Sequence, residues 1–266
     1  TTVSPTYAEE LQDPFYAHGL EGVIADNRGK LRGILNGIDV VQNDPKGNKT
    51  IAKPFSAGRM AGKAECKAAL QQAVGLAPDP KTPVVACVSR LVGHKGFDMV
   101  TQVLDDIMAL GVQMVVLGTG EKRYEEAFLH AQQRYPGRFS AQICYSAPLS
   151  TAIYAGADLF LMPSVSEPCG LSQMIAMRYG TVPVVRETGG LKDTVIPYNK
   201  YTGEGRGFTF TYPSAQDMLW VLREAVELYR TDRKAWKGLQ KADMTADFSW
   251  TASAGQYLAL YRQLTE

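Results

Sequence analysis

The sequence has few cysteines and histidines, and neither residue type forms a pattern. Its four cysteines, Cys66, Cys87, Cys144 and Cys169, are widely spaced and form no CxxC pair. This spacing excludes a zinc ribbon or a CxxC redox motif, and it favours reduced thiols in an intracellular compartment over a disulfide framework. Cys87 and Cys144 lie in apolar runs, so we expect both to pack as small hydrophobic side chains. His18 and His130 have no partners at metal-ligand spacing, and we expect no metal site.

An excess of charge is also missing. The chain has 28 Lys and Arg against 27 Asp and Glu, a formal net charge of +1. We therefore expect no general attraction to nucleic acid or to an anionic membrane, and any basic site must be local. There is no apolar run of about 18 residues and no signal peptide, so we expect no membrane span. The first residues, Thr1 to Pro5, look like the middle of a domain, and we expect the chain to be a fragment.

What the sequence does contain is an alternation of strand and helix patterns. Of its 266 residues 45% are hydrophobic, which is ordinary for a globular protein. Buried strands are expected at 84–88, 113–118, 139–145, 158–162 and 181–185, with an edge strand at 208–210. Helices are expected at 63–74, 97–110, 124–135, 149–156, 171–179, 189–195, 216–230, 236–246 and 250–264. This alternation predicts an α/β fold with a Rossmann-like, doubly wound parallel sheet.

The connecting segments are less regular. Residues 1 to 45 are rich in glycine and should be mostly loop, with Ser4 capping one short helix that has Pro5 at its first position. The segment 198–207, with three glycines, is expected to be a long loop.

One loop with chemistry follows the strand 158–162. It reads Glu167-Pro168-Cys169-Gly170-Leu171-Ser172-Gln173. Ligands of open α/β sheets bind beyond the carboxyl ends of the strands, and free amides at a helix start can hold phosphate oxygens. Glu167 could bind sugar hydroxyls and support positive charge on a sugar carbon. The alternative is structural, with Glu167 capping a loop and Cys169 packing.

A second loop follows the strand 84–88 and contains Arg90 and Lys95, five residues apart, with Gly93 and Gly96 between strand and helix. Two cations, flexible glycines and a helix start favour a diphosphate site. The sequence is neither GxGxxG nor a Walker A motif, so a simple dinucleotide or P-loop site is not indicated. A solvated loop with two surface cations is the alternative.

Two further strand ends could contribute. Gly118 and Thr119 lie in a glycine-rich turn that would let a ligand approach the backbone, although such a turn is as often purely structural. Tyr145 lies at the end of the expected strand 139–145 and could stack on a nucleobase. From the residues alone, a rim or core tyrosine is the more common interpretation.

Three long motifs in order carry a family resemblance: Ser89-Arg90-Leu91 with Lys95-Gly96-Phe97-Asp98, then Glu167-Pro168-Cys169-Gly170-Leu171, then the run from Ala176 to Thr194. Together with Asn36-Gly37-Ile38-Asp39 and Phe248-Ser249-Trp250, they resemble the bacterial glycogen synthases and plant starch synthases over nearly the whole chain. The resemblance implies the C-terminal lobe of a two-lobed glycosyltransferase of the GT-B type. It also implies transfer of glucose from ADP-glucose to the non-reducing end of an α-1,4-glucan, with retention and with neither a metal nor a cofactor.

The resemblance also implies residue roles. Arg90 and Lys95 would neutralise the diphosphate, and Glu167 would face the glucose hydroxyls. Tyr145 matches the adenine-stacking position, which reverses the interpretation from the residues alone. The other implied donor contacts are Asn36 near the interdomain cleft, Gly118 and Thr119 at the nucleotide, the backbone of Cys169, Gly170 and Leu171 at glucose and phosphate, and Ser172 at the phosphate.

The sequence departs from the wider pattern in two ways. Many retaining transferases carry a second Glu eight positions after the first, where this chain has Ile175, but synthases of this family also lack it. The Lys-x-Gly-Gly donor loop and most acceptor contacts of the N-terminal lobe find no match. We therefore expect residues 1–45 to be the end of that lobe and the connection, 46–248 the nucleotide-sugar lobe, and 249–266 a helix crossing back towards the missing lobe. Tyr257, Leu258, Leu260 and Tyr261 on that helix should be partly exposed.

The resemblance names as partners ADP-glucose or ADP, an α-1,4-glucan and the missing lobe. It implies a cytoplasmic enzyme if the source is bacterial and a plastid enzyme if it is a plant. Two other functions stay open: a non-catalytic nucleotide- or glucan-binding module, and a related retaining transferase that uses another sugar nucleotide.

Overall fold

The computed structural model describes residues 1–265. The strands are β1 (Val84–Val88), β2 (Gln113–Leu117), β3 (Phe139–Gln142), β4 (Leu159–Met162), β5 (Val182–Arg186) and β6 (Phe208–Phe210). The helices are α1 (Pro5–Glu10), α2 (Pro14–Ala17), α3 (Glu21–Asp26), α4 (Ala61–Ala73), η1 (Gly93–Lys95), α5 (Phe97–Gln102), α6 (Leu104–Ala109), α7 (Lys122–Arg134), α8 (Ala147–Gly156), α9 (Ser172–Arg178), α10 (Gly189–Thr194), α11 (Ala215–Thr231), α12 (Arg233–Thr245) and α13 (Trp250–Thr265).

The strands form one sheet in the order β3-β2-β1-β4-β5-β6 within the described residues. All of its neighbouring pairs are parallel, for example Ala86 with Val115 between β1 and β2, and Leu159 with Val182 between β4 and β5. The chain winds outward first through β2 and β3 and then, from β4, in the other direction. This order confirms the predicted doubly wound α/β fold and puts its switch point between β1 and β4.

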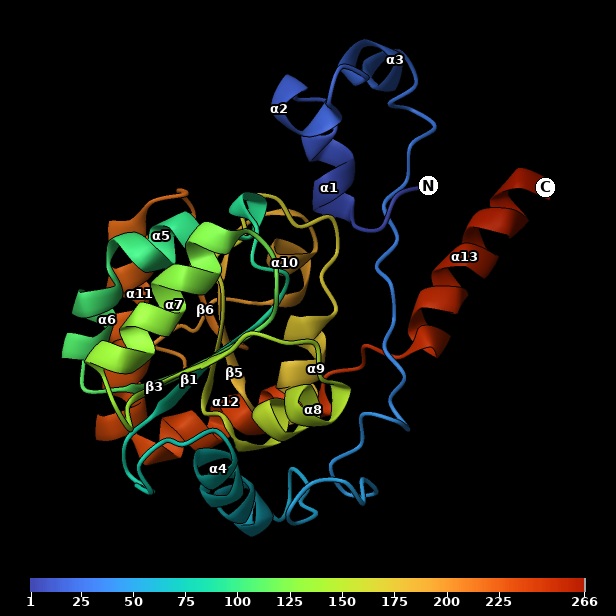
Figure 1. Ribbon diagram of the computed structural model, residues 1–266. Helices are drawn as coiled ribbons and strands as arrows, with labels where there is room; N and C mark the ends of the chain where they lie inside the picture. The colour runs from blue at the N-terminus through green and yellow to red at the C-terminus, as the bar shows by residue number, and fades with distance from the viewer. Residues whose placement is uncertain (266) are drawn as a thin grey trace.

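Helices cover both faces of the sheet (Figure 1). Side chains of a strand point alternately to its two faces, so Val85 and Cys87 pack into one core while Val84 and Ala86 pack into the other. The first core takes buried residues from α5, α6, α7 and α11, and the second from α4, α8, α9 and α10. A strand buried on both faces must be apolar throughout, which explains the unbroken Val84–Val88 run.

Most predicted elements are confirmed, with differences of a few residues at their ends. The helix expected at 97–110 is split at Val103, whose φ of −118° and ψ of 24° are not helical. The strand expected at 139–145 ends at Gln142. Residues 1–45 contain three short helices instead of one. In the first of them, Ser4 caps the helix as predicted, its Oγ accepting a bond from the Tyr7 amide at 2.9 Å.

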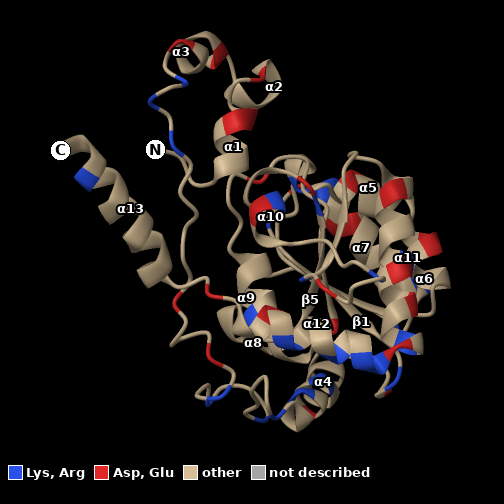
Figure 2. Cartoon of the chain, turned by 180° about the vertical axis from the view of Figure 1, so that it is seen from behind, with Lys and Arg blue, Asp and Glu red and all other residues tan. Residues whose placement is uncertain are grey.

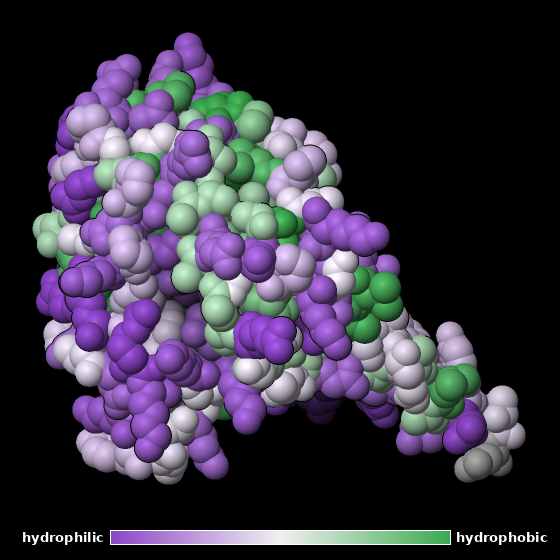
Figure 3. Space-filling model, turned by 90° about the horizontal axis from the view of Figure 1, so that it is seen from below, coloured by the Kyte–Doolittle hydropathy of each residue, from purple (hydrophilic) through white to green (hydrophobic). Residues whose placement is uncertain are grey.

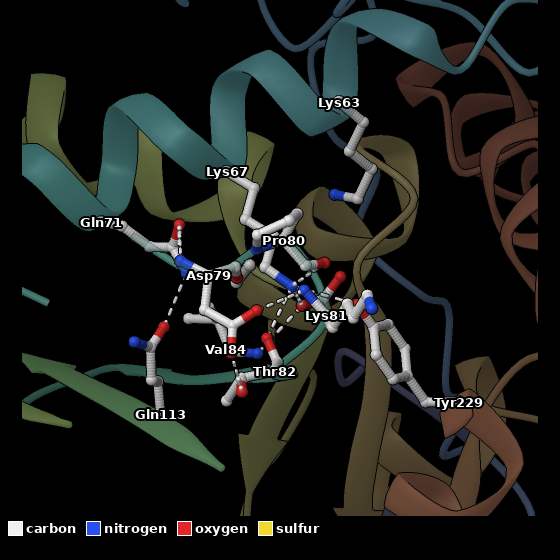
Figure 4. Close-up of polar contacts among 12 residues, drawn as sticks. Lys63, Lys67, Gln71, Asp79, Pro80, Lys81, Thr82, Val84, Gln113 and Tyr229 are labelled. Atoms are coloured by element: carbon white, nitrogen blue, oxygen red, sulfur yellow. Dashed lines mark hydrogen bonds and ion pairs between the residues drawn. The ribbon is translucent and has the colours of Figure 1, made fainter. Parts of the chain in front are cut away.

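A buried ion pair joins several elements at the amino ends of the central strands (Figure 4). The Lys67 ammonium, on α4, donates to Asp158 Oδ2 at 2.7 Å, to the Thr82 carbonyl at 2.7 Å and to the Tyr229 hydroxyl at 3.0 Å. Asp158 Oδ2 also accepts from the Val84 amide at 2.9 Å. The pair therefore ties α4 and α11 to the starts of β1 and β4.

The two ends of the chain are attached to the body by contacts of long sequence separation. Thr6 Oγ1 donates to Asp193 Oδ1 at 2.6 Å, and the amide of Gly189 donates to Glu10 Oε1 at 3.0 Å. At the other end, Ser253 Oγ donates to the Leu35 carbonyl at 2.6 Å. The predicted boundaries at residues 45 and 248 stay a prediction.

Helix α13 projects from the body as an arm with apolar residues on its surface (Figure 3). Leu258 and Tyr261 are each 57% exposed, as expected for a helix with part of its apolar surface uncovered. Lysines, arginines and carboxylates are interspersed over the body, in keeping with the near-zero net charge (Figure 2). Among residues 1–265, no helix combines the length and the apolar character that a membrane crossing requires.

Candidate functional site

The loops that follow β1 and β4 meet at the switch point of the sheet, because these two strands are neighbours. Lys95 ends the η1 turn after β1, and Glu167 lies in the loop after β4. The Lys95 ammonium donates to Glu167 Oε2 at 2.6 Å. The side chains are only 16% and 9% exposed. The structure thus brings together a cation and a carboxylate that are 72 residues apart in the sequence.

Close packing of the two loops fixes this pair. Gly96 has a φ of 78°, and a Cβ there would overlap the Pro163 carbonyl oxygen, so no other residue fits without displacing the loop after β4. The amide of Val165 donates to the His94 carbonyl at 2.9 Å. Partial burial, followed by the nearby cations Lys95 and Arg90, lowers the pKa of the His94 imidazole. His94 therefore favours its neutral form beside the two cations.

Glu167 has a second partner, Ser164, which is buried and donates its hydroxyl to Glu167 Oε2 at 3.0 Å. Two donors on one carboxylate oxygen hold the side chain in a single orientation. The Gly190 amide also donates to the Glu167 carbonyl at 3.2 Å, which links this loop to α10. The position of the Glu167 side chain is therefore set before any ligand arrives.

The turn Cys169-Gly170-Leu171 leads into α9, which begins at Ser172. The fully buried Gln173 side chain holds this turn: its Nε2 donates to the Cys169 carbonyl at 3.1 Å and to the Gly170 carbonyl at 3.0 Å. Cys169 is buried, while Leu171 is 43% exposed.

Asn36 reaches the same turn from the N-terminal segment. Burial raises the pKa of the Cys169 thiol, and a hydrogen bond from the backbone N–H of Asn36 opposes the shift. Asn36, Glu167 and the turn before α9 are thereby neighbours in space.

A pocket of about 290 Å³ opens beside this cluster, at the carboxyl ends of β1, β2 and β3. Arg90, Gly118, Thr119 and Tyr145 all line it. Tyr145 is 92% exposed, so its ring faces are available to a ligand. Gly118 lies so close to Ser89 that a Cβ would overlap the Ser89 carbonyl oxygen, which explains the glycine.

Tyr154 on α8 connects the pocket with the α9 start, since it lines the pocket and its hydroxyl lies beside the Ser172 side chain. Burial raises the pKa of Tyr154 to about 12, so the phenol stays protonated and can donate a hydrogen bond. The site thus has the exposed Tyr145 ring at one end. At the other end are the Arg90 cation, the Lys95–Glu167 pair and the backbone amides at the start of α9.

All of the residues singled out from the sequence lie in this region, in two adjoining groups. Arg90, Gly118, Thr119 and Tyr145 form the pocket group. Lys95, Glu167, the 169–172 turn and Asn36 form the ion-pair group. Sequence reasoning missed three residues, Ser164, Tyr154 and Gln173. A serine two residues after a strand was a usable signal for Ser164, whereas Tyr154 and Gln173 lie inside predicted helices and carry no such signal.

The prediction that Cys144 packs as a buried hydrophobe is wrong. Cys144 is exposed and lines the pocket, whereas Cys66, Cys87 and Cys169 are buried. The reason is that β3 ends at Gln142, so Cys144 lies beyond the strand and outside the core. Across the described residues, no group of three or more His, Cys, Asp or Glu is arranged to hold a metal ion.

The exposed Cys144 provides a label for the pocket. We expect iodoacetamide to alkylate Cys144 well before the three buried cysteines, since alkylation requires access to the thiol. Saturating ADP should slow alkylation of Cys144 severalfold by covering the pocket. Peptide mass spectrometry of timed samples measures both rates. Equal rates with and without ADP, in a chain that binds ADP, would place the nucleotide elsewhere.

Known proteins resemble this chain in sequence. The family Glycosyl transferases group 1 matches residues 71–238. Over 264 residues, 99% of the chain, it is 50% identical to a glycogen synthase of Desulforamulus reducens. It is 47% identical to a glycogen synthase of Streptococcus sanguinis, also over 99% of the chain. The chain spans about half the length of these relatives, 55% and 56% respectively.

Solved structures show the same fold. The catalytic domain of starch synthase IV from Arabidopsis thaliana, bound to ADP and acarbose, superposes with a TM-score of 0.92 at 37% identity. The match covers 98% of this chain and 55% of that one. A sucrose-phosphate synthase from Thermosynechococcus elongatus, 21% identical with a TM-score of 0.63, shares the fold alone. The family match extends from α4 to α12 and includes the loops that carry Arg90, Lys95 and Glu167, and the chain belongs to the group 1 glycosyl transferases.

Proposed function

We propose that this chain is the donor-binding lobe of an ADP-glucose-dependent glucan synthase, which transfers glucose with retention to the non-reducing end of an α-1,4-glucan. The observation that carries the proposal is the Lys95–Glu167 pair at the switch point, beside a pocket lined by Arg90 and Tyr145. The glycogen synthase relatives and the ADP-bound starch synthase support the choice of substrate class and nucleotide.

In this proposal Tyr145 stacks on adenine, and Gly118 and Thr119 line the nucleotide. Arg90, Lys95 and the amides of the turn before α9 receive the diphosphate, while Glu167 and Asn36 face the sugar. Departure of ADP builds negative charge on phosphate oxygens, and preplaced cations and amides stabilise that charge most in the transition state. The proposed reaction uses no metal and no cofactor, because cations and backbone amides of the chain neutralise the negative charge of the departing diphosphate.

The acceptor and most of its contacts belong, in this proposal, to a second lobe that approaches the same edge of the sheet. Closure of the two lobes would exclude water and favour transfer over hydrolysis. The proposed setting is the cytoplasm of a bacterium, or a plastid if the source is a plant, which cell fractionation can check.

Calorimetric titration with ADP, UDP and ADP-glucose tests the donor site. We expect ADP and ADP-glucose to bind and UDP to bind more weakly. A chain that binds none of them contradicts the proposal, and preference for UDP assigns the chain to another donor. Incorporation of glucose into glycogen is expected only when the complementary lobe is supplied. A chain that binds ADP but gives no incorporation with that lobe is a binding module.

Replacing Tyr145 by alanine should weaken ADP binding by about 1 kcal/mol or more, roughly a fivefold or larger rise in the dissociation constant, because base stacking is lost. Tyr212→Ala is the matched control, since Tyr212 is also exposed and does not line the pocket. Equal ADP affinities of the two variants would remove Tyr145 from the nucleotide site.

A further inference from the structure

A second hollow lies apart from the nucleotide pocket, between the loop 196–207 and α11. We call this hollow the α11 groove. It has a volume of about 710 Å³, and its lining includes Tyr198, Asn199, Lys200, Tyr201, Glu224 and Glu227. Phe208, the first residue of β6, also lines it. The groove is therefore at the amino end of β6, whereas the donor loops follow the carboxyl ends of β1 and β4.

Aromatic rings form one wall of the α11 groove. Tyr201 is 87% exposed, and among the described residues the only aromatic or cationic partner of its ring is the Lys200 ammonium, which lies over the ring at 5.4 Å from its centroid. Tyr198 is half-buried and packs on Phe208, with ring centroids 5.8 Å apart. An exposed tyrosine beside an anchored one offers an apolar surface with hydroxyls at its rim.

Backbone hydrogen bonds hold this wall in shape. The amide of Tyr198 donates to the Gly207 carbonyl at 2.8 Å, and the amide of Asn199 donates to the Glu204 carbonyl at 2.8 Å. Asn199 Oδ1 accepts from the Tyr201 amide at 2.9 Å. Because the loop is already ordered, a ligand would bind without the entropic cost of ordering it.

Polar side chains supply the opposite wall. Glu224 and Glu227 are three residues apart on α11, both exposed, and among the described residues neither is in an ion pair. Lys200 adds one cation. Two carboxylates against one ammonium would repel a phosphate-bearing ligand. They suit a neutral ligand with many hydroxyl donors, and the rings suit one with apolar faces.

We propose that the α11 groove binds a short stretch of α-1,4-glucan, as a second contact for the polymer acceptor. A pyranose ring has both hydroxyls around its edge and an apolar C–H face, which match the two walls. The inference rests on the proposed function, because that function supplies a polymeric substrate long enough to occupy two places. Holding the polymer at one place raises the effective concentration of its chain ends at the other.

Affinity electrophoresis of the whole chain in gels with and without glycogen, followed by calorimetry with maltoheptaose, tests the groove. We expect glycogen to retard the chain. Tyr201→Ala should raise the dissociation constant by about three- to tenfold, the range expected for loss of one aromatic contact. Tyr212→Ala is the matched control and should bind as the unchanged chain does. Tyr201 is exposed, so its removal should leave the fold intact, which circular dichroism checks.

The proposal is overturned by absence of retardation, or by equal retardation of the Tyr201 and Tyr212 variants. Binding of oligolysine in place of maltoheptaose would overturn it too, by showing that the carboxylates select a cationic partner. ADP binding is measured in parallel: a chain that binds ADP but no glucan contradicts only the groove, whereas loss of ADP binding contradicts the donor site.

Discussion

Replacing Lys95 by alanine is expected to weaken ADP binding by about 10- to 100-fold, because a charge-assisted hydrogen bond to the diphosphate contributes about 1.5–3 kcal/mol. In the enzyme assembled with its second lobe, the transfer rate should fall by about 100- to 1000-fold, by analogy with the loss of one preorganised donor to a developing negative charge. Calorimetry with ADP and incorporation of glucose into glycogen measure the two effects.

Two variants sharpen this test. Lys95→Arg keeps the charge but changes the geometry, so it should retain more ADP affinity than Lys95→Ala. Lys237→Ala removes an exposed cation on α12, outside both groups of site residues, and should bind ADP normally. If Lys95→Ala binds ADP as tightly as Lys237→Ala does, Lys95 does not contact the nucleotide.

The largest effect on stability is expected from Lys67→Ala. Its removal leaves Asp158 buried without a cation and also leaves the Thr82 carbonyl and the Tyr229 hydroxyl without this donor. Breaking a buried pair from one side typically costs about 3–5 kcal/mol of the free energy of unfolding. Urea unfolding followed by circular dichroism measures the loss.

An exposed pair on α7 provides the comparison. Lys122 and Glu126 are 3.4 Å apart with side chains 85% and 57% exposed, so Lys122→Ala should cause no measurable change. The double variant Lys67→Met/Asp158→Asn should be less destabilised than the sum of its single variants, because it leaves no uncompensated charge. Additive losses would mean that the two side chains stabilise the fold independently.

The sheet was predictable because most of its strands are short apolar runs that alternate with helix patterns. Val84–Val88 is buried on both faces, and only a parallel sheet with helices on each side satisfies such a run. Strand ends were less predictable. Ile143 and Cys144 continue the apolar run after β3, yet no pairing to β2 extends past Gln142. A run of apolar residues does not reveal where the neighbouring strand stops.

The candidate site was predictable as residue types, and its contacts were not. Arg90, Lys95 and Glu167 stood out by their places after strands, but the 2.6 Å contact between Lys95 and Glu167 depends on β1 and β4 being neighbours. Ser164 and Gln173 act by holding Glu167 and the 169–172 turn. Their roles follow from distances within the folded loop, and the spacing of residues in the sequence does not predict those distances.

The contacts that fasten the two chain ends bear on how the molecule assembles and opens. Thr6 meets Asp193 across 187 positions, and Ser253 meets Leu35 across 218. Pairings of such separation close the largest loops in the chain and are entropically the most expensive to form early. The sheet and its helices should therefore condense first and the ends dock onto a finished surface. The same ends would detach first under mild denaturant, so hydrogen exchange should be fastest at α1–α3 and α13 while the central strands are still protected.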